Sequence, residues 1–269
     1  MISKLNIKNS FAFVLALLLL ACSNDKKQIV TTLNNLVWQD EFSTDGAPNA
    51  TLWNYNIGTG SNGWGNNELQ NYTDRSENIV IQNGVLKITA IKEPYFGSAY
   101  TSARILTKGK FNKKYGRLEA RIKMPYGKGL WPAFWLLGST SDTELWPQCG
   151  EIDIMEYLGS NPTTIFGTLH GPGYSGGAAV SKNFTLPNNR FDNDFHIFGI
   201  EWGENYINFY VDDVLYNQIT PAKVPGEWVF NKPFYIILNM AVGGNYPGSP
   251  NNDTVFPQTM LIDYVRVYE

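Results

Sequence analysis

The sequence predicts an all-β domain built as a sandwich of two antiparallel sheets. From about residue 36 onward, short segments rich in β-branched and aromatic residues alternate with turn signals made of Gly, Pro, Asn and Asp. No stretch has a convincing amphipathic helical period, apart from one turn expected near residues 221–226. Many strands separated by turns at short intervals are typical of a two-sheet sandwich. The last residues also have the strand pattern, so we expect one domain that ends in a sheet.

The expected strands follow one another along the chain. Residues 79–90 should form a hairpin, because Asn83-Gly84 favours the backbone of a two-residue turn. Residues 116–124 alternate apolar and charged side chains and should be half exposed. The pair Asp212-Asp213 should turn the chain between two more strands. Further strands are expected at residues 196–202, 206–211, 214–216, 234–242 and 260–268.

One expected strand, residues 150–158, carries three carboxylates among apolar residues. Successive side chains of a strand point to opposite faces, so Glu151 and Asp153 share one face while the isoleucines beside them are buried against the other. Glu156 lies five positions after Glu151, and in a regular strand this odd spacing would turn it into the core. One extra residue near Met155, a β-bulge, would return it to the face of the other two acids.

Three carboxylates crowded on one face repel one another, which a hydrophobic core would not tolerate. Two carboxylates about 5 Å apart, with pKa values pushed apart, perform retaining glycoside hydrolysis. A solvated strand face and a calcium site are the alternatives. The strand by itself leaves all three interpretations open.

The N-terminal residues have the pattern of a bacterial lipoprotein signal. Lys4 and Lys8 precede an apolar run, residues 11–20, that is too short to span a bilayer. The run is followed by Ala21 and Cys22 in a sequence that resembles a bacterial lipobox, which implies cleavage before Cys22 and lipid on its sulfur. Ordinary secretory cleavage near Ala21 is the alternative. The expected divisions are a signal peptide at 1–21, a flexible polar tether at 22–35 and one catalytic domain at 36–269.

A lipid on Cys22 would anchor the mature protein in the bacterial cell envelope, at the outer membrane or cell surface. Cys149 would then be the only thiol of the mature chain, so no intrachain disulfide is expected. We interpret Cys149 as a packed residue, because a nucleophilic cysteine needs a histidine partner that the sequence does not place beside it.

The composition argues against some partners and favours others. Charged residues make up 17% of the chain, the net charge is −3 and no run of basic residues occurs. Nucleic acid and anionic membrane surfaces are therefore poor candidates as main partners. Aromatic residues make up 14%, and their flat faces suit sugar rings as well as a sandwich core.

The motif from Glu151 to Glu156 resembles that of glycoside hydrolase family 16, in its laminarinase-like branch. Alone the short motif would be weak, but further segments match the family in the same order. The resemblance extends from about Val37 to Glu269, nearly the whole mature chain. The matching segments are residues 38–42, 64–70, 72–73, 100–105, 129–137, 167–171, 238–245 and 262–268.

This resemblance implies a concanavalin-like β-jelly roll whose concave sheet carries an open substrate cleft. It implies endo-hydrolysis of β-glucans with retention of anomeric configuration, by a monomer whose chemistry requires no cofactor. Within the family, the form with one additional residue before the second Glu, here Met155, resembles β-1,3-glucanases. The expected substrate is therefore β-1,3-glucan such as laminarin, with mixed-linkage β-1,3-1,4-glucan second.

The family motif also implies a role for each acid. Glu151 would be the ionised nucleophile, which forms a glycosyl-enzyme intermediate. Glu156 would be the acid/base, protonated at first. Asp153 would hydrogen-bond the nucleophile and keep the two pKa values apart.

Five other residues fall in segments that match cleft walls in the family. Trp131 and Trp135 lie four positions apart, so a strand places both on one face, where they could stack on glucose rings. Asn66, Glu68 and Arg104 could hydrogen-bond sugar hydroxyls. Core packing is the alternative for the tryptophans, and turn formation or surface solvation is the alternative for the polar residues.

Two further polar residues belong to expected strands. The resemblance favours a cleft position for His170, contacting substrate near the acid/base, although a lone histidine is more often structural. Asn239 interrupts an apolar run, and a buried amide needs hydrogen-bond partners. It should face the cleft or satisfy a neighbouring loop.

The resemblance also implies a possible structural calcium ion on the convex side, where members of the family often hold one. The matching positions are Glu41 and Gly84, through backbone carbonyls, and the carboxylate of Asp263. A plain solvent-facing acid is the alternative for Asp263. No His/Cys cluster in the sequence supports zinc.

Three rival functions are also compatible with the sequence. A glycan-binding lipoprotein without activity could share the fold, although it would not need a crowded acidic triad. A second is a hydrolase of the same family that acts on agarose, carrageenan or xyloglucan. The low content of basic residues argues against the sulfated substrates among these. A transglycosylase differs only in whether sugar or water accepts the intermediate.

Overall fold

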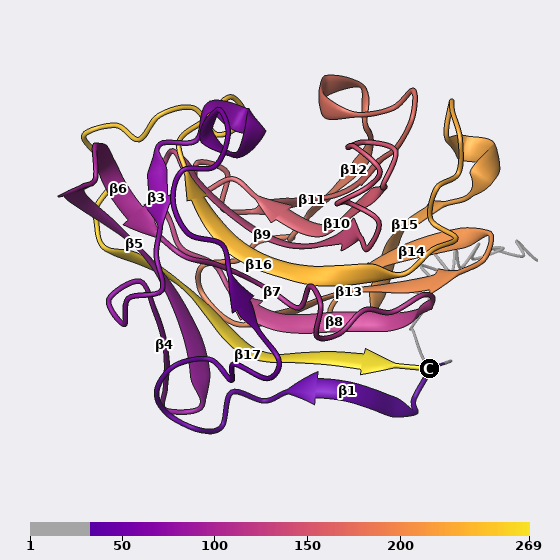
Figure 1. The fold of residues 1–269 in the computed structure, drawn as a ribbon, viewed down its shortest axis with the longest axis horizontal. Helices are drawn as coiled ribbons and strands as arrows, with labels where there is room; N and C mark the ends of the chain where they lie inside the picture. Colours follow the sequence, from indigo (N-terminus) through magenta and orange to yellow (C-terminus); the bar gives the residue numbers. More distant parts are fainter. Residues whose placement is uncertain (1–32) are drawn as a thin grey trace, which may run out of the picture.

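The computed structural model describes residues 33–269, whose strands form two sheets packed face to face (Figure 1). The predicted signal peptide, most of the predicted tether and Cys22 lie outside the described residues. Among residues 33–269, no helix has the length and apolar character needed to cross a membrane.

The larger sheet has ten strands and carries both ends of the described chain. Asn35 and Glu269 exchange backbone hydrogen bonds of 3.2 and 2.9 Å, so the first and last strands lie side by side (Figure 1). The strand order is β15 (Val214–Ile219), β14 (Tyr206–Val211), β13 (His196–Gly203), β8 (Gly116–Lys123), β17 (Gln258–Tyr268), β5 (Val85–Tyr95), β6 (Ser98–Ser102) and β3 (Gln70–Tyr72), with β1 (Leu36–Asp40) paired to β17 and β4 (Ile79–Gln82) paired to β5.

The smaller sheet has seven strands, and β10 lies at its third position. Its order is β12 (Val180–Thr185), β11 (Thr164–His170), β10 (Glu151–Tyr157), β9 (Leu130–Gly138), β16 (Phe234–Val242), β7 (Arg104–Leu106) and β2 (Asn54–Tyr55). Three short helical turns lie in the connections: η1 (Gly63–Asn67), η2 (Gly176–Ala178) and η3 (Pro221–Lys223).

The hairpin and the turn near residue 221 are confirmed, and one pairing differs from expectation. Asn83 and Gly84 have φ values of 57° and 74° between β4 and β5, the left-handed backbone that a two-residue turn requires. β3 and β6 pair in parallel, whereas every other described strand pair is antiparallel. A parallel pair cannot be closed by a tight turn, so local turn signals did not reveal it.

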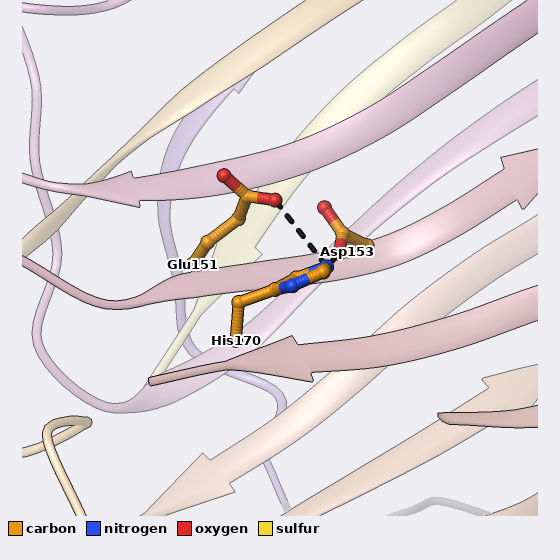
Figure 2. Close-up of side chains that lie close together, drawn as sticks. All are labelled: Glu151, Asp153 and His170. Atoms are coloured by element: carbon orange, nitrogen blue, oxygen red, sulfur yellow. Dashed lines mark ion pairs between the residues drawn. The ribbon is translucent and has the colours of Figure 1, made fainter. Parts of the chain in front are cut away.

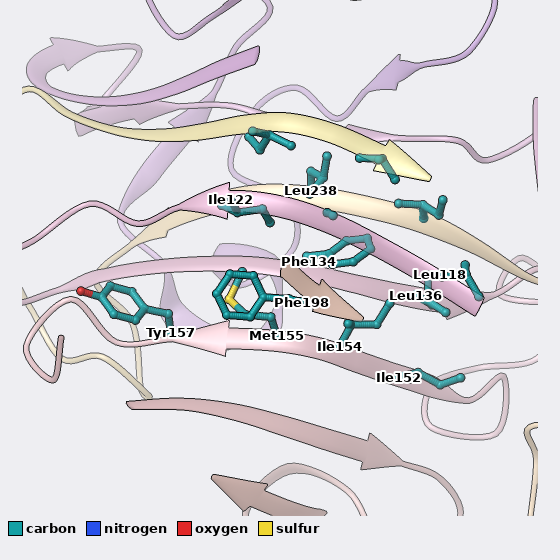
Figure 3. Packing of buried hydrophobic residues seen from close by; sticks show 14 of the residues in the cluster. Leu118, Ile122, Phe134, Leu136, Ile152, Ile154, Met155, Tyr157, Phe198 and Leu238 are labelled. Atoms are coloured by element: carbon teal, nitrogen blue, oxygen red, sulfur yellow. The ribbon is translucent and has the colours of Figure 1, made fainter. Parts of the chain in front are cut away.

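The core fills the space between the sheets (Figure 3). From the smaller sheet, Phe134, Ile152 and Met155 are completely buried, and they belong to one cluster with Leu118 and Phe198 of the larger sheet. Each such side chain stabilises the fold by about 1.5–3 kcal/mol through burial of apolar surface. Because one face of β10 is anchored in this core, its other face is held in a fixed orientation.

Strand β8 is less exposed than its alternating pattern predicts. Leu118 and its apolar neighbours face the core, but Glu119 on the opposite face is only 3% exposed. Its carboxylate accepts a hydrogen bond from Arg117 Nε at 2.8 Å and one from Tyr268 Oη at 3.3 Å. The sequence did not show that a neighbouring strand would cover this charge.

Candidate active site

Strand β10 contains the β-bulge that the spacing of its acids predicts. Asp153 is opposite Trp135 on β9, and Met155 is opposite the very next β9 residue, Phe134, so β10 has one residue more than its neighbour. Consecutive residues Ile154 and Met155 are both buried in the core. The bulge thereby turns Glu156 away from the core, on the same side as Asp153.

Glu151, Asp153 and His170 form a close cluster on the outer face of the smaller sheet (Figure 2). His170 lies opposite Glu151 on the adjacent strand β11. Its Nε2 atom is 3.1 Å from Asp153 Oδ2 and 3.5 Å from Glu151 Oε1. The imidazole therefore lies beside Glu151 and Asp153, whereas the resemblance implied contact with substrate near Glu156. The expected direct hydrogen bond from Asp153 to Glu151 does not form among the described residues, where both acids instead approach His170 Nε2.

Glu156 has its own set of hydrogen-bond donors. Trp131 Nε1 donates to Glu156 Oε1 at 3.1 Å, and Thr168 Oγ1 donates to Oε2 at 3.2 Å. Trp131 comes from β9 and Thr168 from β11, so the two strands that flank β10 hold the carboxyl group from both sides. Its position is consequently fixed by the sheet and not by a loop.

The three acids have raised pKa values with one main cause. Burial raises the pKa of Glu151, Asp153 and Glu156 alike, each to about 8. Asp153 adds to the rise for both glutamates by repulsion. Burial acts on Glu151 and Glu156 in the same direction, so burial alone does not produce the predicted separation of their pKa values. Because the three carboxylates repel one another, the cluster holds a proton near neutral pH, as a general acid requires.

The same cluster could be mistaken for a metal site. Ligand atoms of Glu151, Asp153 and His170 lie within 4.8 Å of one another. However, the backbone N–H of Gly176 donates a hydrogen bond to His170 Nδ1 at 3.1 Å. The ring proton must then be on Nε2, the atom that faces the acids, so this atom has no free lone pair for a metal. The donor set does not fit a metal ion.

Trp131 and Trp135 share one face of β9, as their spacing predicts, and both lie on the side of the acids. Trp135 Nε1 donates to Asn239 Oδ1 at 2.7 Å, and Arg104 lies over the Trp135 ring with its guanidinium carbon 4.8 Å from the ring centroid. The same carbon is 4.7 Å from the ring centroid of Trp64. Arg104 is therefore held by aromatic contacts as well as by its place in the sheet.

Glu68 is the centre of a hydrogen-bond network beyond Arg104. It accepts hydrogen bonds from Gln70 Nε2 at 2.6 Å, Tyr72 Oη at 3.3 Å and Asn66 Nδ2 at 3.3 Å. Asn239 Nδ2 donates to Tyr72 Oη at 3.1 Å and so joins this network to Trp135. The structure thus brings together all seven residues predicted to bind substrate, on the side of the smaller sheet that carries the acids.

Comparison with known proteins decides the family. The sequence model of the protein family described as Glycosyl hydrolases family 16 matches residues 66–266 of this chain. The chain belongs to glycosyl hydrolase family 16. This family 16 chain is 43% identical to a β-glucanase of Rhodothermus marinus over 245 residues, which cover 87% of this chain and 84% of that protein.

Two solved structures of similar proteins confirm the predicted jelly-roll fold. The laminarinase catalytic domain of Thermotoga maritima MSB8 superposes with a TM-score of 0.84 at 50% identity, covering 89% of this family 16 chain and 99% of that domain. The endo-β-1,3-glucanase of Pyrococcus furiosus gives a TM-score of 0.84 at 48% identity, covering 89% and 98%.

Two aromatic residues beside the acids of this family 16 site were not predicted from the sequence. Trp146 Nε1 donates to Glu151 Oε2 at 3.0 Å, and its ring centroid is 5.7 Å from that of His170. The ring centroid of Tyr246 lies 5.3 Å from that of Trp131, beside Glu156. Burial, followed by the charge of Glu156, raises the pKa of Tyr246. Both residues belong to loops, where no periodicity indicates direction, and only the high aromatic content pointed to them.

The residues predicted to bind calcium are separate from the acids. Arg121 Nη1 lies 2.6 Å from Asp263 Oδ2, and Arg266 donates to both carboxylate oxygens of Glu41 at 2.7 and 2.8 Å. A guanidinium group therefore already neutralises the one carboxylate predicted to bind calcium. The backbone carbonyls of Glu41 and Gly84, the other predicted ligands, are not used by these ion pairs.

Cys149 is a packed residue, as predicted. It is 1% exposed, and burial raises the pKa of its thiol to about 11. A thiol with so high a pKa is a poor nucleophile at neutral pH.

Proposed function

We propose that this family 16 enzyme is a retaining endo-β-1,3-glucanase that cleaves laminarin-type chains through Glu151 and Glu156. The observation that carries the proposal is the bulge at Ile154 and Met155, which brings Glu156 to the face of Asp153. Similarity to a laminarinase and to an endo-β-1,3-glucanase over most of their length supports the choice of substrate.

In the proposed reaction, Glu156 donates its proton to the glycosidic oxygen while Glu151 attacks the anomeric carbon. The carbon–oxygen bond to the leaving sugar breaks as the glycosyl ester to Glu151 forms. Glu156, now ionised, removes a proton from water, whose oxygen attacks the same carbon and releases Glu151. Two inversions give net retention.

The contacts of the two glutamates support this division of roles. Burial and then Asp153 raise the pKa of Glu151, but His170 and, less strongly, Arg104 oppose that rise and favour an ionised nucleophile. The donors to Glu156 are the neutral groups of Trp131 and Thr168, which can hold it before and after proton transfer.

The remaining predicted features belong to the same proposal. Mixed-linkage β-1,3-1,4-glucan is the second substrate. The enzyme acts as a monomer, attached through lipid on Cys22 to the outer membrane or surface of the bacterial cell envelope. Calcium at Glu41, Gly84 and Asp263 is a structural addition that the chemistry does not use.

The function is tested by incubating the wild type and Glu151→Gln with laminarin, lichenan and agarose, and by sizing the products. We expect short oligosaccharides from laminarin, fewer from lichenan and none from agarose, with the variant inactive but still bound to laminarin. Binding without hydrolysis by the wild type would instead identify a glycan-binding protein. Products longer than the substrate would identify a transglycosylase.

A further inference from the structure

The loop that follows β11 passes back over the last residue of that strand. Gly171 and Tyr174 exchange backbone hydrogen bonds of 2.9 and 3.0 Å, which reverses the chain after His170. Tyr174 is completely buried, and its hydroxyl donates to Glu227 O at 2.7 Å. This anchored turn places the N–H of Gly176 against His170 Nδ1.

That one contact decides which nitrogen of His170 carries the proton. A nitrogen that accepts a hydrogen bond has no hydrogen of its own, so Nδ1 is unprotonated and the ring is the neutral Nε2–H form. A second proton on Nδ1 would point at the N–H of Gly176.

Nε2 is the ring atom of His170 that lies nearest the acids. Nε2 is 3.1 Å from Asp153 Oδ2, an atom that is buried and has no hydrogen-bond partner of good geometry in the described part of the chain, and 3.5 Å from Glu151 Oε1. Trp146 covers the ring on another side, 5.7 Å between centroids. A small movement of either acid toward Nε2 forms a charge-assisted hydrogen bond.

We propose that the N–H of Gly176 locks His170 in the Nε2–H tautomer, and that His170 is thereby a positioning residue for Glu151 and Asp153. The proposal rests on the proposed function only where it names Glu151 the nucleophile. The loop after β11 thus acts on the reaction through a histidine.

The lock depends on an unusual backbone conformation at one of two adjacent glycines. Gly176 has a φ of 54°, whereas Gly177 has no such left-handed backbone. A side chain at either position would meet open space, and both residues are exposed. Valine at 176 therefore disturbs the backbone alone, since a β-branched residue strongly disfavours positive φ. Valine at 177 is the matched control.

The first experiment reads the tautomer by ¹⁵N NMR of protein labelled at histidine. The chain has 2 histidines, so His170→Gln assigns the signals. We expect the Nε2–H tautomer for His170 in the wild type and in Gly177→Val, and a mixture of tautomers or the imidazolium in Gly176→Val. An Nδ1–H tautomer in the wild type, or identical spectra for the two valine variants, would overturn the proposal.

The second experiment measures kcat and KM against pH on laminarin. Gly176→Val should lower kcat about tenfold, roughly the effect of one hydrogen bond to a charged group, with KM changed less than about twofold. His170→Leu should do the same and move the acidic limb of kcat/KM to higher pH, because a lost donor disfavours ionised Glu151. His170→Gln, which offers an amide N–H near the Nε2 position, should retain more activity than His170→Leu.

The charged groups around Glu151 show why the limb should move in that direction. The charged and titratable groups are Asp153 and Glu156 on its own strand, Arg104 on β7, His170 on β11 and the thiol of Cys149. Equal activity and equal pH profiles for His170→Leu and the wild type would contradict the proposal. An inactive wild type would refute the proposed function instead, and the NMR result would still decide the tautomer.

Discussion

The indole N–H of Trp131 donates a hydrogen bond to Glu156 Oε1 at 3.1 Å, from a strand adjacent to the one that carries the acid. The contact links a residue expected to stack on sugar with the residue expected to protonate the leaving group. Trp131 thus combines two features that a substitution can separate. One is the aromatic surface, and the other is the donor to the carboxyl group.

Trp131→Phe keeps a ring and removes the donor. Because the lost hydrogen bond favoured the ionised form of Glu156, the pKa of Glu156 should rise, and the alkaline limb of kcat/KM should move to higher pH. We expect kcat to fall about tenfold, from poorer placement of the acid. Trp228→Phe, whose N–H bonds to Glu204 O elsewhere, is the control. An unchanged alkaline limb would show that the contact has no effect on the acid.

Arg104→Lys tests the contact with Trp64 and Trp135. Lysine keeps the charge but loses the planar group that lies over the two rings, so kcat/KM on laminarin should fall about tenfold. Arg75→Lys is a matched control, because Arg75 also lies over a ring, that of Tyr95, at 4.5 Å. Equal kinetics for the two lysine variants would contradict a role for Arg104 in the site.

Gly167→Ala tests how tightly β11 packs against the opposite sheet. A methyl group there would lie 2.2 Å from the hydroxyl of Tyr216 and 2.7 Å from the ring of Phe209. We expect the free energy of unfolding to fall by about 1–3 kcal/mol, the usual effect of overpacking, as measured by urea denaturation. Gly177→Ala meets open space and should change it by less than about 0.5 kcal/mol. An equally small effect of Gly167→Ala would mean that Tyr216 can move aside at no cost, and it would contradict tight packing of β11 at this position.

The raised pKa values also predict how stability depends on pH. Burial raises the pKa of Glu156 from its ordinary 4.5 to about 8, so between these values the folded state binds more protons than the unfolded state. Glu156 therefore makes its whole contribution to the free energy of unfolding below pH 4.5. This contribution is lost as the pH rises through 8. Glu156→Gln should stabilise the fold by about 1–2 kcal/mol more at pH 8.5 than at pH 4. Parallel curves of Tm against pH for the variant and the wild type would contradict the raised pKa.

The position of the acids was predictable from the sequence because strand geometry fixes it. Alternation placed Glu151 and Asp153 together, and the odd spacing to Glu156 required the bulge that the structure contains. The Asn83-Gly84 hairpin was predictable for a similar reason, since its turn needs left-handed backbone that few residues adopt.

Features that depend on distant pairing were not predictable. Arg121 approaches Asp263 across 142 residues of sequence, and Trp146 reaches Glu151 from an aperiodic loop. The acidic strand also gave no sign that all three carboxyl pKa values would rise together, because burial depends on the strands and loops around it. Local patterns thus determined which face the acids occupy, and the tertiary structure determined what contacts them.

The most direct test of the mechanism is to trap the intermediate with a 2-deoxy-2-fluoro laminaribiosyl fluoride and to identify the labelled residue by peptide mass spectrometry. The 2-fluoro group slows both steps, because it destabilises their positively charged transition states. The fluoride leaving group makes only the first step faster again, so the ester accumulates. We predict one label, on Glu151. A label on Glu156, or none while the enzyme still hydrolyses laminarin, would contradict the account.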